Sequence, residues 1–155
     1  METDLFIVDD SGLLGLVDAA SYSTFVGEDW TYEQLLNHFA KQMQLGTLLV
    51  WDCADGGNNY RVKVRNRITS EAGYREVSGH IVATSGKLNL ASYTALTMAA
   101  QFPEYGIPDK SEADQVIAVA PGPYKVRMVQ KYDPAASTSD GGELLLEFEP
   151  GEAPR

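Results

Sequence analysis

The chain has 155 residues, of which 44% are apolar and 22% charged, and its formal net charge is −10. This length suits one domain, and no apolar run approaches the roughly 18 residues that cross a bilayer, so a helical membrane protein is excluded. A single cysteine excludes an internal disulfide framework and a multi-cysteine zinc site.

The first residues, METDLFIVDD, predict a strand and no export signal. They are acidic and lack the basic start and apolar core of a secretion signal, so we expect a cytoplasmic protein. Apolar runs at 4–8 and 13–17 flank the turn-like DDSG, which predicts that the chain opens with a hairpin.

Residues 31–45 carry the clearest helical pattern. Thr31 and Gln34 form a capping box, and Gly46 supplies a stop. The apolar side chains follow at helical spacing and form one stripe, so the helix is expected to pack one face against a sheet. The stripe consists of Tyr32, Leu35, Leu36, Phe39 and Met43.

Strands are predicted at 47–52 and 60–65. The segment between them has three interpretations: a reactive thiol site, a calcium loop or a hairpin turn. Cys53 lacks a CxxC partner, and DCADGGNN lacks the alternating acids and closing Glu of a calcium loop. Gly and Asn tolerate positive φ, so we prefer a hairpin turn, with Cys53 as a packing residue.

The second half of the chain predicts further strands at 76–84, 87–92, 116–120, 124–132 and 143–150. Ser85-Gly86 and the PGP at 121–123 are interpreted as hairpin turns. Residues 92–101 fit a short helix or a strand extension, and the Ser92 cap and the alanines favour the helix.

About eight short strands and one good helix predict a mainly β protein, an antiparallel β-sandwich. We expect a single domain over residues 1–150 and a loose tail at 151–155.

Charge is segregated along the chain. Residues 1–57 hold ten acids against one base, whereas residues 58–100 hold six bases against two acids. The overall negative charge makes nucleic acid an unfavourable partner and attracts basic proteins. A simpler explanation of the excess acid is that it keeps a small protein soluble. The cations Arg61, Lys63, Arg65 and Arg67 are expected to pair with acids on neighbouring strands rather than with an external phosphate.

No catalytic motif is present: the chain has no nucleophile elbow, P-loop or dinucleotide fingerprint. Two histidines, His38 and His80, have no partner that the sequence can assign, and they make a zinc site improbable. We therefore expect a non-enzymatic protein without a metal or cofactor.

The layout over residues 47–149 resembles the bacterial competence-J type of nuclease inhibitor, and uncharacterised sandwich domains of toxin and immunity systems. The compared parts are the alternating strand YRVKVR, the pair EVSGHIVATSGKLNL, the run VIAVAPGPYKVRMVQKY and the last strand ELLLEFE. The resemblance implies a β-sandwich that binds a protein partner and performs no chemistry.

The first functional hypothesis is an acidic protein-binding domain, an inhibitor or immunity-type factor for a basic protein such as a nuclease. Its candidate contact residues are Glu28, Asp29, Trp30, Asp52 and Asp55.

Two alternatives remain open from the sequence. A small-ligand or carbohydrate-binding sandwich would line a groove with Trp30, Trp51 and Tyr60. An enzyme would use His38 or His80 with nearby acids.

Overall fold

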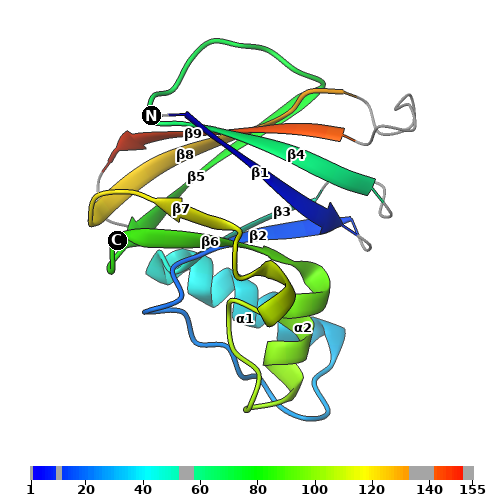
Figure 1. Cartoon of the computed structure of the whole chain (residues 1–155). Helices are drawn as coiled ribbons and strands as arrows, with labels where there is room; N and C mark the ends of the chain where they lie inside the picture. The colour runs from blue at the N-terminus through cyan, green and yellow to red at the C-terminus, as the bar shows by residue number, and fades with distance from the viewer. Residues whose placement is uncertain (1, 10–11, 53–57, 133–141, 152–155) are drawn as a thin grey trace.

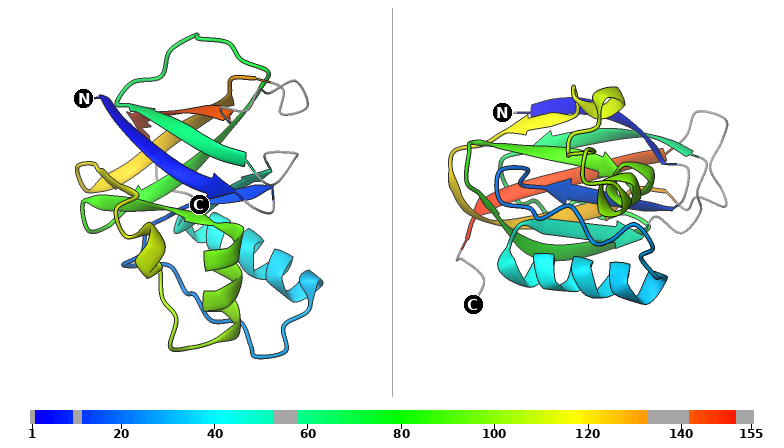
Figure 2. Two further views of the ribbon diagram at one scale, coloured as in Figure 1. Left: turned by 45° about the vertical axis from the view of Figure 1, so that its right-hand side comes forward. Right: turned by 90° about the horizontal axis from the view of Figure 1, so that it is seen from below.

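Two stacked β-sheets form the molecule, and two helices lie against the outer face of the smaller sheet (Figure 1). The structure is a computed structural model of the whole chain, and it describes residues 2–9, 12–52, 58–132 and 142–151. The left view of Figure 2 shows both helices below the strands. The predicted β-sandwich is confirmed.

The larger sheet has five strands in the order β1-β4-β9-β8-β5. Neighbouring strands are antiparallel except for β4 and β9, which are parallel, so the expectation of a purely antiparallel sandwich was wrong at this pair. Both strands begin at the same end of the molecule, so they run in the same direction. The strands are β1 (Glu2–Asp9), β4 (Asn58–Arg65), β5 (Arg75–Ala83), β8 (Gly122–Gln130) and β9 (Gly142–Pro150).

The smaller sheet has four strands, all antiparallel to their neighbours, in the order β3-β2-β6-β7. Its last strand has only three residues. The strands are β2 (Leu13–Val17), β3 (Leu48–Asp52), β6 (Lys87–Ser92) and β7 (Val116–Ala118).

Both predicted helices are present. In α1 (Tyr32–Leu45), the Thr31 hydroxyl accepts a hydrogen bond from the Gln34 amide at 3.2 Å, the Gln34 side-chain oxygen accepts one from the Thr31 amide at 2.9 Å, and Gly46 is left-handed. In α2 (Tyr93–Gln101), the Ser92 hydroxyl accepts from the Ala95 amide. A short 3-10 turn, η1 (Lys110–Glu112), precedes β7.

Two apolar clusters hold these layers together. The first lies between the sheets and includes Trp51, Tyr60 and the inward-facing residues of β4, as the alternation of that strand predicts. The second lies between the smaller sheet and the helices, where Leu35 and Phe39 of α1 are buried. Of the predicted helix stripe, Tyr32 and Leu36 stay exposed.

All four predicted hairpins were wrong, for one physical reason. β1 and β2, β3 and β4, β5 and β6, and β7 and β8 each belong to different sheets, so none of these consecutive pairs forms a ladder. Gly, Pro and Asn show where the chain reverses, but the same residues serve a reversal between two sheets. Cys53, with its packing interpretation, lies outside the described residues.

The connection from β4 to β5, residues 66–74, crosses the outer face of the larger sheet (Figure 1, top). We call it the strap. The Tyr74 amide donates to the Lys131 carbonyl at 3.2 Å, and Thr69 bonds Glu147 of β9. Gly73 packs so closely that an added Cβ would lie 2.5 Å from Val129 Cγ1 and 2.8 Å from the Gln130 carbonyl oxygen.

Gly73→Ala is expected to lower the free energy of unfolding by about 1 to 3 kcal/mol, because the strap must lift from β8 to admit the methyl group. Gly27→Ala is the control, since a Cβ there meets nothing within 4 Å. Chemical denaturation of both variants measures the difference. Equal stabilities would contradict the close packing of the strap.

Candidate functional site

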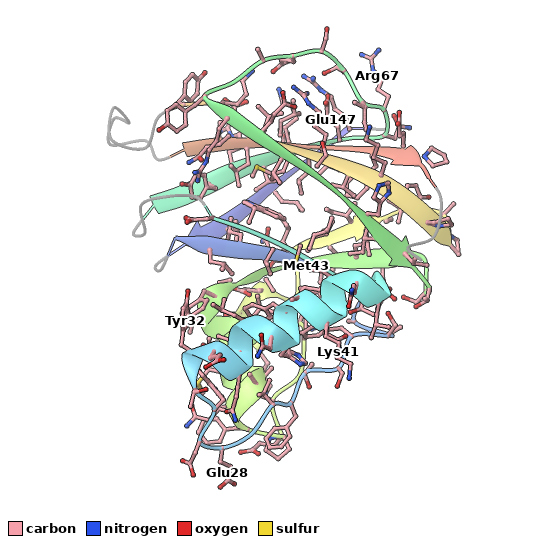
Figure 3. The ribbon with its side chains drawn as sticks, turned by 180° about the vertical axis from the view of Figure 1, so that it is seen from behind. Glu28, Tyr32, Lys41, Met43, Arg67 and Glu147 are labelled. Carbon is pink, nitrogen blue, oxygen red and sulfur yellow. The ribbon has the colours of Figure 1, made fainter. Side chains whose placement is uncertain are left out.

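Four exposed carboxylates of the acidic first segment lie on one side of the molecule, which we call the acidic end: Glu28, Asp29, Glu33 and Asp52. The amino-terminal end of α1 and the carboxy-terminal end of β3 lie on the same side, at the right in Figure 1. Glu28 and Tyr32 mark this end in Figure 3. The fold therefore places two parts of the acidic first segment on the same side, one before and at the start of α1 and the other at the end of β3.

The loop before α1 is held in place by backbone contacts. The amides of Val26 and Gly27 both donate to the Ala100 carbonyl at the end of α2, at 2.8 and 3.0 Å. The Ser23 amide donates to the Gln42 side chain at 3.2 Å. Glu28 and Asp29 are consequently presented on a loop that is tied to both helices.

Trp30 supports this loop rather than projecting from it. Its side chain is half-buried and packs against the second apolar cluster. Within the described residues its indole Nε1 is buried and has no hydrogen-bond partner. The exposed large side chains nearby are Tyr32 (63% exposed), Leu36 (43%) and Phe25 (43%).

Asp52 is exposed at the end of β3, where its backbone carbonyl accepts a hydrogen bond from the Arg75 guanidinium. This cation lowers the local negative potential, so Asp52 adds less to the acidic end than its charge suggests. The other predicted carboxylate, Asp55, lies outside the described residues.

One acid of the first segment is not at the surface. Asp18 is fully buried and accepts hydrogen bonds from the hydroxyls of Ser21 and Thr84 and from the Thr84 amide. Its role is to join the end of β2 to the end of β5. The net charge of residues 1–57 is therefore larger than the charge that these residues present at the surface.

Sequence reasoning missed Glu104. This exposed residue follows α2, against whose last turn the Val26–Gly27 backbone packs. Its nearest aromatic pair, Phe102 and Tyr105, has ring centroids 5.9 Å apart. No local pattern reveals this neighbourhood, because it arises only when α2 packs beside the loop.

A buried ion cluster lies beneath the strap. Glu147 of β9 is fully buried, and Arg127 Nη1 donates to its Oε1 at 2.8 Å. Arg65 of β4 lies 3.5 Å from the other carboxylate oxygen, which also accepts from the Thr69 hydroxyl at 2.6 Å. Glu76 of β5 pairs with Arg127. Figure 3 shows Glu147 between the sheet and the strap.

The strap contributes an acid of its own to this cluster. Glu71 pairs with Lys131 and with Arg65, whose Nη1 lies 3.0 Å away. The predicted cross-strand pairing is confirmed for Arg65 through Glu147.

Ion pairing controls the titration of the two central acids. Burial alone would raise the pKa of Glu147, but hydrogen bonds from Thr69 and Arg127 outweigh it, and the pKa is lowered. Hydrogen bonds from Lys131 and Arg65 lower the pKa of Glu71 to about 2. Because both values are depressed in the folded state, the resulting stability is present above pH 4.5 and lost as the pH falls towards 2.

Glu147→Gln is expected to lower the free energy of unfolding at pH 7 by about 3 kcal/mol, because buried Arg127 loses its buried carboxylate and retains the exposed Glu76 as its ion-pair partner. The difference from the wild type should shrink as the pH falls below 4.5, because the Glu147 carboxylate takes up a proton first in the unfolded chain and only at lower pH in the folded protein. Urea unfolding at several pH values measures it. The control is Glu149→Gln on the same strand, expected to change stability by less than about 0.5 kcal/mol. A loss that is independent of pH would contradict this role.

Trp30, Trp51 and Tyr60 do not line a common groove, as a small-ligand or carbohydrate-binding site would require. Trp51 (6% exposed) and Tyr60 (1%) lie in the inter-sheet core, whereas Trp30 packs on the far side of the smaller sheet. This version of a carbohydrate site was wrong, because alternation along β3 and β4 turns both rings inward.

The histidines do not meet. His38 lies on α1 in edge-to-face contact with Tyr22, their ring centroids 5.6 Å apart, and burial lowers its pKa. His80 is exposed on β5, opposite Lys125 of β8. Neither lines the cavity at the amino-terminal end of α2 or the cavity between the sheets.

The described residues contain neither a metal-binding cluster nor a membrane-spanning helix. No group of three or more His, Cys, Asp and Glu side chains there is arranged to hold a metal ion. No helix in the same part of the chain has the length and apolarity to cross a membrane.

Comparison with known proteins finds similarity of structure alone. No protein-family model matches the chain, and no curated protein matches its sequence. A solved structure described as crocagin biosynthetic gene J aligns with a TM-score of 0.63 and 15% identity, over 98% of both chains.

A second solved structure is ComJ from Bacillus subtilis, described as an inhibitor of the DNA-degrading activity of NucA. It aligns with a TM-score of 0.56 and 10% identity, over 96% of both chains. The resemblance to competence-J type inhibitors is thus confirmed at the level of the fold, and it extends over the helices as well as the strands.

Proposed function

We propose that this chain is a non-catalytic cytoplasmic protein that binds a basic protein, a nuclease being the best candidate, and inhibits it. The acidic end carries the proposal, because its carboxylates stand beside exposed apolar side chains on a loop fixed by two helices. The shared fold with ComJ supports an inhibitor and says nothing of the contact surface.

The two kinds of side chain at the acidic end have different roles in binding. Glu28, Asp29 and Glu33 raise the rate of encounter with a basic surface. Tyr32 is 63% exposed and supplies a rigid aromatic anchor of the kind that dominates binding energy. Trp30 positions the loop from beneath.

The mode of inhibition follows from the chemistry of a nuclease. An enzyme that cleaves DNA holds phosphates on a positively charged surface. A protein that presents fixed carboxylates can occupy that surface and exclude the DNA. No catalytic group is required of the inhibitor.

The cations of the chain do not provide a competing nucleic-acid surface in this proposal. Arg65, Arg127 and Lys131 are paired with acids beneath or beside the strap. Lys63 stands opposite the exposed Asp4 in the β1–β4 register. The charges of Arg65, Arg127 and Lys131 are therefore compensated by acids of the larger sheet and the strap.

The double variant Glu28→Gln, Asp29→Asn is expected to weaken partner binding roughly tenfold, mainly by slowing association. Tagged protein in lysate of its own cells, at low and high salt, captures the partner, which mass spectrometry identifies. Purified partner then serves for binding kinetics and for assay of DNA degradation.

The matched control is Asp4→Asn, Glu149→Gln, which changes the net charge equally but on the larger sheet. We expect this control to bind like the wild type. If both double variants bound the partner equally weakly, net charge alone would explain the loss of affinity, and this would contradict a defined site. Failure to retain any basic protein at low salt would remove the main support for the proposal.

Tyr32→Ala is expected to weaken the same complex by about 2 kcal/mol while changing folding stability by less than about 0.5 kcal/mol. Tyr74→Ala is the control, because Tyr74 is also half exposed but lies on the strap. Equilibrium binding and thermal unfolding separate the two effects. Unchanged affinity in Tyr32→Ala would show that the anchor lies elsewhere.

A further inference from the structure

A cavity of about 320 Å³ lies between the two sheets, at the end where β4 and β9 finish. This is the end opposite the acidic end (Figure 1). Small-molecule sites usually measure roughly 300 to 1,000 Å³. The apolar lining residues are Val64, Ile117, Val119, Tyr124, Phe148 and Pro150.

Unequal strand lengths create this cavity. In the larger sheet, β8 and β9 have nine residues each, whereas β7 at the edge of the smaller sheet has three. The inward-facing Tyr124 and Phe148 therefore extend beyond the strand that should cover them. The chain after β7 lines the resulting space with Val119 and Ala120 instead of filling it.

The walls of the cavity are fixed by specific contacts. The Tyr124 hydroxyl donates to the Ala120 carbonyl at 2.6 Å, which ties β8 to the connection between β7 and β8 beside the cavity. Tyr124 also meets Phe148 edge to face, with centroids 6.0 Å apart. Val64 and Ile117 are held in the inter-sheet core. The site is consequently formed in advance of any ligand.

The polarity of the lining limits what can bind. Among the described lining residues the single charged side chain is Arg65, and its Nη1 is engaged with Glu71 and Glu147 on the outer face of the larger sheet. A charged ligand would lose its water without gaining an uncompensated partner. Asn66 is exposed and offers an amide for one hydrogen bond.

We propose that this cavity binds a compact, neutral aromatic molecule. Its ring would lie among Val64, Ile117 and Phe148, because preformed apolar cavities take up apolar molecules in preference to water. One polar substituent would point towards Asn66. This site does not depend on the proposed inhibitor function, since it uses none of the residues of the acidic end.

A methyl NMR titration tests the proposal with three probes that share one ring: benzyl alcohol, benzoate and benzylamine. Benzyl alcohol is expected to shift the methyl signals of Val64, Ile117 and Val119 saturably. The anion and the cation should bind at least tenfold more weakly. Absence of saturable shifts at these methyls, or tighter binding of either charged analogue, would overturn the proposal.

Filling the cavity provides the matched test. Val119→Trp is expected to lower the affinity for benzyl alcohol at least tenfold, and Val119→Phe, the milder change, should lower it less. Asn37→Trp adds the same ring to an exposed position of α1 and should bind like the wild type. Wild-type affinity in a folded Val119→Trp or Val119→Phe protein would place the ligand elsewhere and overturn the proposal.

Discussion

The chain changes sheets four times between consecutive strands, and the rest of the architecture depends on this constraint. Two of the crossings, from β1 to β2 and from β3 to β4, occur at one end of the sandwich, and the crossings from β5 to β6 and from β7 to β8 occur at the other. Strand ends and loops from distant parts of the sequence therefore meet at each end. The inter-sheet cavity lies where the chain crosses from β7 to β8, and Asp52 of the acidic end lies where it crosses from β3 to β4.

The larger sheet needs additional protection because helices cover only the smaller one. The strap supplies it. Val129 and Leu145 are buried on the outer face, and Glu147 beside them accepts hydrogen bonds from the strap residue Thr69. A buried carboxylate is costly unless it is paired, and here two arginines and Thr69 pair it. The same pairing removes Arg65 and Arg127 from the set of cations that could meet an external phosphate.

Local signals in the sequence predicted local structure well. The Thr31–Gln34 capping box and Gly46 fixed the limits of α1, and the alternation in β4 placed Tyr60 in the core. The pairing of the strands could not be predicted from the sequence, because turn residues do not indicate whether the next strand joins the same sheet or the other one. The acidic segment was visible in the sequence, but the burial of Asp18 and the half-buried state of Trp30 follow from packing. The cavity arises from a mismatch of strand lengths that no motif records.

We propose that the acidic end is the surface that recognises a protein partner. Hydrogen–deuterium exchange of the chain, alone and with the basic protein that it retains, locates this surface. We predict slower exchange in residues 25–36, which hold the loop and the first turn of α1, and unchanged exchange in the strap. Slower exchange confined to the strap and the outer face of the larger sheet would contradict it.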